Sequence, residues 1–332
     1  MALHPQKDIR GRVLVTGANG FIGARLCHTL RERGVEVVAG VRRGANLDYL
    51  GEDRPPLQFG DVTKPETFED LLDNIDIVIH NAGLVKATRS EHLFAVNAQG
   101  AEALMQAALR RGQATRFIYI SSQAAAGPST GAPRRETDEP APITDYGRSK
   151  LAGEQSLLRY RDRINLQILR PSGVYGPGDR ETFTFFQAVA RGIRPHIGDI
   201  TRPVSVIYVD DLTAGIAQAL GHDLPSGEIY SLAEPDERSF AELLVLICQT
   251  LDRRTLAIPI PGPVFRALGA LSQSARLFGA APMLTWEKAG EVLAGWRVSI
   301  ERASKHFDFA PQIPFPEGAR RAIEWYREQG WL

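Results

Sequence analysis

The feature that most constrains this chain is a short apolar run that ends in three spaced glycines. Residues 13–15 are Val-Leu-Val, and Gly17, Gly20 and Gly23 follow. In a dinucleotide-binding fold the first glycine permits a tight turn, the second lets the backbone approach a pyrophosphate, and the third lets the next helix pack closely on its strand. That helix, expected over residues 21–33, presents free N–H groups to the anion. Ordinary strand–helix turns also carry glycines, so later residues decide the matter.

Strand-like and helical stretches alternate through the first half of the chain. This alternation predicts an α/β fold, a doubly wound parallel sheet of the Rossmann type with helices on both faces. The expected strands are residues 13–15, 35–41, 57–59, 75–79, 116–120 and 166–169, and the expected helices are residues 21–33, 67–73, 91–111 and 146–160.

Beyond Pro171 this rhythm loosens, because Pro and Gly become frequent and short apolar runs mix with irregular stretches. The simplest interpretation is a second, smaller domain. We expect a dinucleotide-binding domain of residues 1–172 plus about 205–233, and a C-terminal substrate domain of residues 173–204 plus 234–332. Within the substrate domain, the apolar stretch of residues 256–284 is expected to form buried or substrate-facing helix.

Composition narrows the class of protein. Lys plus Arg and Asp plus Glu both number 39, so the formal charge is zero, which argues against a nucleic-acid partner. Only two cysteines occur, Cys27 and Cys248, which favours a reducing cytoplasm over a disulfide framework. Residues 1–10 lack the apolar core of a secretion signal, and no stretch reaches about 18 uninterrupted apolar residues, so no membrane span is predicted. No metal site is predicted, and the expected partner is a small molecule.

A tyrosine and a lysine four residues apart mark the second decisive segment. Tyr146 and Lys150 fall on one face of the expected helix 146–160. A phenol has an ordinary pKa of about 10, and a nearby ammonium group favours the phenolate and brings that pKa towards neutral pH. Such a pair suits general acid–base catalysis, although tyrosine–lysine pairs are also common on helix surfaces.

Polar side chains upstream of this pair are further candidates. Ser121 and Ser122 end the expected strand 116–120, at the edge where such a sheet forms its binding crevice, so a hydroxyl there can orient a substrate oxygen. Serines at strand ends also cap helices, and that alternative stays open. Asn97 interrupts an apolar helix. It is either a buried amide bonded to backbone or a residue that holds water in a proton relay.

Taken together, these motifs resemble the extended short-chain dehydrogenase/reductase family. That family includes nucleotide-sugar epimerases and dehydratases, dihydroflavonol reductases and 3β-hydroxysteroid dehydrogenases, and the last two form the branch to which this chain is most similar. The resemblance runs nearly end to end, through residues 16–23, 60–62, 80–83, 96–97, 121–122, 146–150, 169–179, 208–211 and 318–332.

The resemblance implies roles for individual residues. Tyr146 would be the acid/base, Lys150 its pKa partner and a ribose ligand, and Ser122 the group that orients the substrate oxygen. Asn97 would be the relay residue. The implied cofactor-binding residues are Gly17, Asn19, Gly20, Phe21, Ile22, Gly23, Arg42, Arg43, Asp61, Val62, Ala82, Gly83, Tyr146, Lys150, Pro171 and Val174.

The nucleotide is expected to be NADP(H). Family members that prefer NAD typically end the second strand with an acidic residue that binds both ribose hydroxyls. Val41 holds that place here, and Arg42 and Arg43 follow it. A missing carboxylate beside a guanidinium suits a 2′-phosphate. NAD is the alternative if the two arginines are only a solvated pair.

The substrate is less constrained by the sequence. Dehydratases of the family usually carry an Asp-Glu pair after the catalytic serine or threonine. This chain has Gln123 and Ala124 there, so a 4,6-dehydratase is disfavoured. Nucleotide-sugar epimerases often place an arginine where this chain has Val204, and Arg202 lies two residues too early. The remaining arginines that could supply this charge are Arg180 and Arg194.

We therefore expect an oxidoreductase that interconverts a secondary alcohol and a ketone by hydride transfer. One alternative is a nucleotide-sugar 4-epimerase that retains its cofactor. Another, from a different class, is a non-catalytic NADP(H)-binding regulatory protein. By analogy with the family, residues 91–111 and 146–160 are expected to pair in a homodimer.

Overall fold

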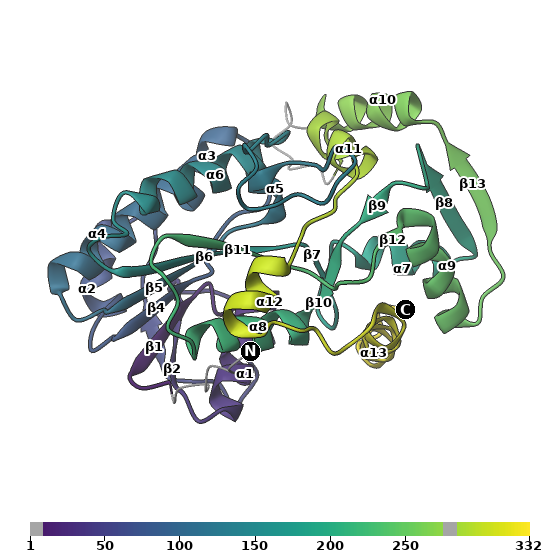
Figure 1. Cartoon of the computed structure of the whole chain (residues 1–332). Coiled ribbons are helices and arrows are strands. Elements are labelled where there is room, and N and C mark those ends of the chain that lie inside the picture. The colour runs from purple at the N-terminus through teal and green to yellow at the C-terminus, as the bar shows by residue number, and fades with distance from the viewer. Residues whose placement is uncertain (1–8, 275–283) are drawn as a thin grey trace.

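A seven-stranded parallel sheet forms the centre of the protein (Figure 1). The computed structural model describes residues 9–274 and 284–332. The strand order is β11-β6-β5-β4-β1-β2-β3, so the direction of winding reverses between β1 and β4. The bounds are β1 Arg12–Thr16, β2 Glu36–Val41, β3 Leu57–Phe59, β4 Ile77–His80, β5 Arg116–Ile120, β6 Asn165–Pro171 and β11 Glu228–Leu232. The predicted doubly wound sheet is confirmed, and its six expected strands are all present.

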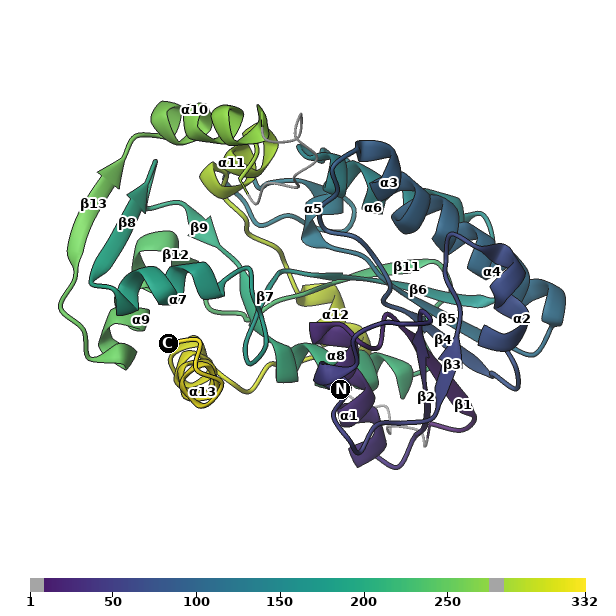
Figure 2. The ribbon, with the colours of Figure 1, turned by 180° about the vertical axis from the view of Figure 1, so that it is seen from behind.

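Helices cover both faces of the sheet, which is why its strands are almost continuously apolar (Figures 1 and 2). Successive side chains of a strand point to opposite faces. Val13 and Val15 therefore pack with helices α1 (Phe21–Glu32) and α8 (Val209–Leu220), whereas Leu14 packs on the other face. That other face is covered by α2 (Phe68–Leu71), α4 (Ala101–Arg111) and α6 (Asp145–Leu158).

The expected helix 91–111 is interrupted by a wider, π-helical turn. Helix α3 covers Ser90–Phe94, the π-helical turn covers Ala95–Gly100, and α4 follows. Single π-helical turns of this kind are frequent at functional sites. The turn carries Asn97, and Gly153 of α6 permits its close approach, because a Cβ there would lie 2.4 Å from the Asn97 carbonyl oxygen.

Smaller two-stranded sheets and a third apolar core lie beyond the carboxyl ends of the central strands. The pairs are β7 (Gly173–Tyr175) with β10 (Val206–Tyr208), β8 (Ile193–Ile197) with β13 (Leu256–Ile260), and β9 (Pro203–Val204) with β12 (Arg238–Ser239). The third core is built on α7 (Phe183–Ala190), α9 (Phe240–Leu251) and α13 (Phe315–Glu328). Helix α12 (Glu301–Phe307) instead contributes Ala303 and Phe307 to the core of the central sheet. The domain division stays a prediction.

The expectation for residues 256–284 is wrong in part. Leu256–Ile260 is the strand β13, and the helix α10 (Gly262–Gln273) exposes most of its apolar side chains. Three prolines, at 259, 261 and 263, end the strand and start the helix. Residues 275–283 lie outside the described part of the chain. Across residues 9–274 and 284–332, none of the helices combines the length and apolar character needed to cross a bilayer.

Candidate active site

The glycine loop forms a tight cradle at the start of α1. Gly17 has a φ of +65°, and a Cβ there would lie 2.7 Å from the Cα of Ala82. A Cβ on Gly23 would lie 2.2 Å from the Gly17 carbonyl oxygen. Gly20 is the N-cap of α1 and, as a glycine, has no side chain that could bond to the helix terminus. The amide groups of this terminus are thus open to an anion, so the loop fits a dinucleotide pyrophosphate.

The carboxyl end of β4 is fixed beside this cradle. The Thr16 hydroxyl lies 2.7 Å from Nδ1 of His80 and accepts a 3.1 Å hydrogen bond from the backbone N–H of Ala82. Gly83 follows, and a Cβ there would lie 3.0 Å from Oδ1 of Asn97 and 3.3 Å from Nζ of Lys150. Backbone next to the glycine loop can therefore meet a ligand without an intervening side chain.

The predicted nucleotide-selecting residues lie at the ends of β2 and β3. Arg42 and Arg43 are exposed, and Arg43 stacks over the Phe59 ring at 5.0 Å. The Asp61 carboxylate accepts hydrogen bonds from the backbone N–H and hydroxyl of Thr63, at 2.9 and 2.7 Å. Burial raises the pKa of Asp61, but these bonds and the nearby cations, Arg42 among them, outweigh it and hold the pKa below its ordinary value. Asp61 is thus ionised near neutral pH.

The remaining predicted cofactor residues occupy neighbouring positions along the same edge. Pro171 is the last residue of β6, and Val174 lies in β7, which follows at once. Phe21 and Ile22 begin α1, and the Asn19 side chain donates a 3.1 Å hydrogen bond to the Asn46 carbonyl. Val62 packs against Gly100, where a Cβ would lie 2.9 Å from the Val62 carbonyl oxygen.

Ser122 and Tyr146 are brought together where one short helix packs against α6. Ser122 lies two residues after β5 and caps this short helix, α5 (Gln123–Ala126), by accepting a 3.1 Å hydrogen bond from the Ala124 N–H. Helix α6 packs closely on α5 because Gly147 has no side chain; a Cβ there would lie 2.3 Å from the Ala124 carbonyl oxygen. Burial raises the pKa of Tyr146 to about 12, and a hydrogen bond with Ser122 opposes this rise. The Ser122 hydroxyl and the Tyr146 phenol thus lie within hydrogen-bonding distance of each other.

Lys150 lies one turn further along α6. Its Nζ donates a 2.7 Å hydrogen bond to the Ile120 carbonyl and sits 4.6 Å from the centre of the Tyr119 ring. Burial lowers the pKa of Lys150 to about 8, and the Glu154 carboxylate opposes this change. Lys150 is therefore a buried amine whose proton is unusually easy to release at neutral pH.

Asn97 is fully engaged by hydrogen bonds. Its amide exchanges two bonds of 2.8 Å with the backbone of Leu84 and donates a third, of 2.9 Å, to the Ser149 hydroxyl. Its carbonyl accepts a 2.8 Å bond from the Tyr119 hydroxyl. Asn97 thereby ties the loop after β4 to α6. The relay role stays a prediction.

A buried ion pair connects the elements around Tyr146 and Ser122. The Arg170 guanidinium donates from Nε and Nη2 to the two carboxylate oxygens of Glu154, at 2.9 and 2.6 Å, and both side chains are at most 2% exposed. Glu154 also accepts a 2.5 Å bond from the Ser121 hydroxyl. The pair thus joins α6 and β6, which carry Tyr146 and Pro171, to the segment after β5 that carries Ser122.

Residues 13–233 match the sequence model of the NAD dependent epimerase/dehydratase family. The chain belongs to this family. It is 30% identical over 337 residues to ceramide reductase of Caulobacter vibrioides, across 98% of this chain and 97% of that protein. It is 29% identical over 325 residues to UDP-glucose 4-epimerase of Vibrio cholerae, across 94% of each. The crystal structure of gox2253 matches with a TM-score of 0.82, at 27% identity, over 97% of this chain and 99% of that chain.

Membership in the epimerase/dehydratase family confirms the resemblance predicted from the motifs, and the chain is therefore an enzyme. The cradle at Gly17 and Gly23 and the open terminus of α1 fit the dinucleotide cofactor of such enzymes. The assignments of individual site residues remain predictions.

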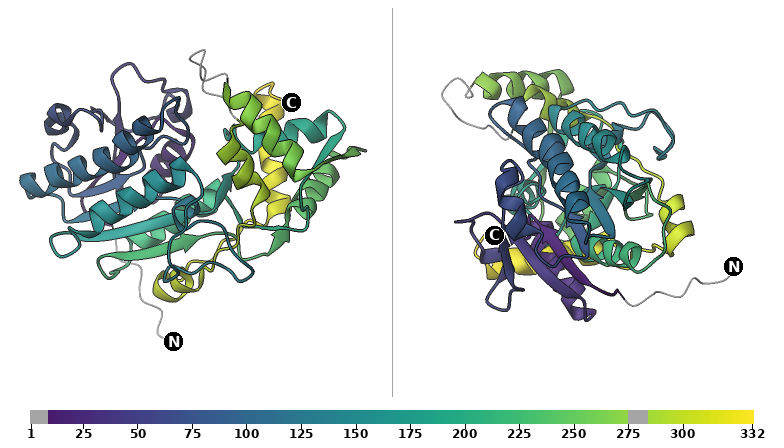
Figure 3. Two further views of the ribbon diagram at one scale, coloured as in Figure 1. Left: turned by 90° about the horizontal axis from the view of Figure 1, so that it is seen from above. Right: turned by 90° about the vertical axis from the view of Figure 1, so that its left-hand side faces the viewer.

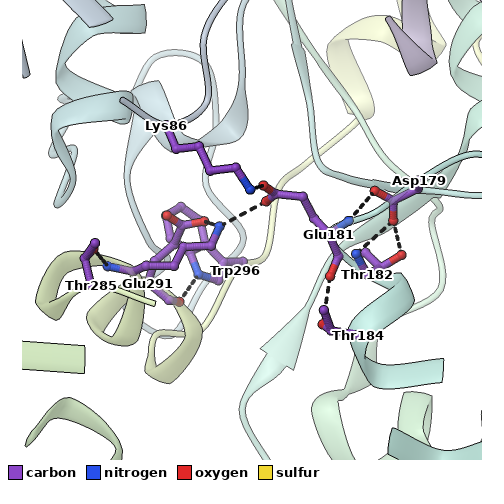
Figure 4. A network of polar contacts seen from close by, with 9 residues as sticks. Lys86, Asp179, Glu181, Thr182, Thr184, Thr285, Glu291 and Trp296 are labelled. Carbon is purple, nitrogen blue, oxygen red and sulfur yellow. Dashed lines mark hydrogen bonds and ion pairs between the residues drawn. The ribbon is translucent and has the colours of Figure 1, made fainter. Parts of the chain in front are cut away.

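The structure adds a group of charged side chains that no motif indicates (Figure 4). Nζ of Lys288 lies 2.8 Å from Glu291 and 3.6 Å from Glu181, and Glu181 lies 3.5 Å from Nζ of Lys86. Lys288 and Glu291 belong to α11 (Trp286–Leu293), Lys86 follows β4, and Glu181 precedes α7. We call these four residues the charged network.

Helix α11 brings this network to α6, the helix that carries Tyr146. The Glu287 carboxylate accepts a 2.9 Å hydrogen bond from the Asp145 N–H and forms an ion pair with Arg148, on either side of Tyr146. Lys288 is the cation with the strongest effect on the Tyr146 phenol, and it lowers the pKa, whereas Glu291 and Glu181 raise it. A cation on a second, distant element thus also acts on Tyr146. Sequence reasoning missed Lys288 because it lies 142 positions after Tyr146.

Substitutions in this network are expected to move the pH profile in opposite directions. Lys288→Met removes a cation that favours the phenolate, so the pKa seen in the pH dependence of kcat/KM should rise. Glu291→Gln removes an anion that disfavours the phenolate, so the same pKa should fall. Glu324→Gln on the exposed face of α13 is the control and should leave the profile unchanged. Shifts of the same sign in both network variants would contradict this electrostatic role.

Proposed function

We propose that this enzyme interconverts a secondary alcohol and a ketone, preferring NADP(H) and taking a hydrophobic substrate. The observation that carries this proposal is the hydrogen bond between Ser122 and Tyr146, on the helix whose Lys150 lies beside Gly83. When bound, the nicotinamide supplies or accepts a hydride at its C4. In the reducing direction the ketone carbon takes that hydride and the ketone oxygen takes a proton, which gives the alcohol.

The residues of the chain would manage that proton. Ser122 would hold the substrate oxygen by a hydrogen bond, and Tyr146, whose ordinary form is the protonated phenol, would donate the proton. Lys150, with a pKa of about 8, would bind ribose and return a proton to the phenolate from solvent. In the oxidising direction the same groups act in reverse.

The surroundings of Arg202 support a hydrophobic substrate over a nucleotide sugar. Its guanidinium donates to the carbonyls of Ile197 and Asp199, at 2.6 and 2.5 Å, and lies 4.2 Å from the centre of the Phe240 ring. Val204, where the epimerases of the family often have an arginine, is partly buried against the third apolar core. Val204 itself therefore supplies no cation for a sugar diphosphate. The similarity to ceramide reductase also favours a lipid-like substrate.

The second candidate is a nucleotide-sugar 4-epimerase, which the similarity to UDP-glucose 4-epimerase favours. It would use the same residues but retain its cofactor through oxidation and re-reduction. The test is a screen of long-chain ketones, alcohols and nucleotide sugars with both nicotinamide cofactors, after desalting. We expect net oxidation of added NADPH with a hydrophobic ketone. Tight retention of the cofactor with sugar epimerisation and no net turnover would overturn the reductase.

The preference for NADP(H) is expected to depend on Arg42 and Arg43. Replacing both with serine removes the guanidinium groups proposed to bind the 2′-phosphate, which should lower kcat/KM for NADPH by about ten- to a hundredfold. The value for NADH should change little. Arg33→Ser, an exposed cation at the other end of α1, is the matched control. An equal loss with both cofactors, or no loss with either, would contradict the proposed nucleotide site.

A further inference from the structure

Helix α10 turns an apolar stripe away from the protein. Val264, Leu268 and Leu271 recur at the spacing of one helix face, and the side chains are about half exposed or more, Leu271 at 72%. The inner face is held by Gly269, where a Cβ would lie 2.6 Å from the Thr285 carbonyl oxygen. A surface helix ordinarily buries its apolar face and exposes its polar one. Helix α10 instead leaves most of its apolar side chains exposed.

The exposed stripe continues onto the neighbouring elements. Leu256 and Ile258 alternate on the edge strand β13, with Leu256 at 70% exposure. Trp286, which begins α11, is half exposed, and the Arg266 guanidinium lies 5.5 Å from the centre of its ring. Figures 1 and 3 show β13, α10 and α11 along one rim of the molecule. We call the exposed apolar side chains of these elements the rim patch: Leu256, Ile258, Val264, Leu268, Leu271 and Trp286.

Positive charges predominate beside the rim patch, where Arg253, Arg254 and Arg266 outnumber the two flanking acidic residues, Asp252 and Glu287. Residues 253–274 contain three arginines, Arg253, Arg254 and Arg266, and no aspartate or glutamate. All three arginines are exposed. This pattern complements an anionic surface. A second copy that met the same patch about a two-fold axis would bring like charges together, so the charge pattern disfavours that occupant.

The rim patch is directly connected, through α11, to the part of α6 that carries Tyr146. Trp286 belongs to the patch, and the next two residues of α11 are Glu287, which contacts Asp145 and Arg148, and Lys288, which acts on Tyr146. A surface that contacts Trp286 would therefore lie within one helical turn of Glu287 and Lys288.

We propose that the rim patch docks on the surface of a lipid bilayer that contains anionic lipids. Apolar side chains with a half-exposed tryptophan and flanking arginines are the groups that bury a helix face in the bilayer interface. Docking would place α11, which contacts α6 beside Tyr146, at the membrane surface. The advantage of that placement rests on the proposed hydrophobic substrate, but the docking itself does not depend on the substrate.

The test is flotation of the purified full chain with lipid vesicles, in the absence of substrate. The chain should float with vesicles of phosphatidylcholine plus phosphatidylglycerol, bind less to phosphatidylcholine alone, and lose binding as salt is raised. Leu268→Asp/Leu271→Asp should reduce the bound fraction at least tenfold. Arg253→Ser/Arg254→Ser should abolish the preference for phosphatidylglycerol. Gln329→Asp, an exposed position that follows α13, is the control for added charge and should bind normally.

Absence of vesicle binding by the unaltered chain, or equal binding by the aspartate double variant, would overturn docking. Light scattering tests whether a second copy of the chain occupies the patch instead. In that case the unaltered chain would form a dimer and the aspartate double variant would not. That outcome would also overturn docking. A failed flotation would overturn the docking but not the proposed alcohol–ketone activity. Turnover of a short, water-soluble ketone by the aspartate double variant would show that catalysis does not require docking.

Discussion

Tyr146→Phe is expected to lower kcat by about 10²- to 10⁴-fold while binding of NADPH changes little. The substitution keeps the ring in its place against α5 but removes the only group proposed to give the substrate oxygen its proton. Steady-state turnover with the best ketone from the substrate screen measures the first quantity, and quenching of protein fluorescence by NADPH measures the second.

Two further variants make this result specific. Ser122→Ala should lower kcat by a smaller factor, about ten- to a hundredfold, because it removes the hydroxyl that orients the oxygen but leaves the proton donor. Tyr160→Phe, just beyond α6, removes a phenol bonded to Gln106 and Glu102 and should leave kcat unchanged. Turnover near the unaltered rate in Tyr146→Phe would show that another group moves the proton.

Glu154→Ala is expected to lower the free energy of unfolding by about 3–5 kcal/mol. It leaves the Arg170 guanidinium buried without its carboxylate, and it also removes the acceptor of the Ser121 hydroxyl. Urea denaturation measures the loss. The double variant Glu154→Leu/Arg170→Met replaces the pair with apolar side chains of similar volume and should recover most of the stability, because no charge then stays buried alone.

An exposed pair provides the matched comparison. Glu317 bonds to Arg320 and Arg321 on the surface of α13, where solvent screens the charges. Glu317→Ala should therefore lower the free energy of unfolding far less than Glu154→Ala does. A loss in Glu154→Ala as small as that in Glu317→Ala would contradict the claim that the buried pair holds α6, β6 and the segment after β5 together.

The sheet and the cofactor cradle could be predicted because their signals are local. A parallel strand covered on both faces is a run of apolar residues, and the turn after β1 accepts only glycine at 17 and 23 for steric reasons that spacing alone reveals. Ser122 and Tyr146 were predicted as partners because each ends or begins an element at the same edge of such a sheet. Their contact also depends on Gly147, whose role becomes visible only in the packing of α6 on α5.

The features that escaped prediction depend on contacts between distant segments. Lys288 reaches Tyr146 because α11 docks on α6 through Glu287, and no periodicity in either helix encodes that docking. The apolar residues of α10 resemble an ordinary buried helix face in the sequence. They are exposed because Gly269, on the other face of the helix, packs against the protein. The pattern of apolar residues alone does not show which of the two faces is buried. The π-helical turn at Asn97 likewise follows from its bonds to Leu84 and Ser149.

Isotope tracing reveals whether the enzyme transfers a hydride from NADPH to a ketone in net turnover. The purified enzyme is incubated with a hydrophobic ketone and NADPH that carries deuterium on the transferred side of C4. We expect one deuterium on the carbinol carbon of each alcohol formed, with one NADP⁺ released per alcohol. A nucleotide sugar epimerised without deuterium uptake and without accumulation of NADP⁺ would instead show that the site returns its hydride to the molecule from which it came.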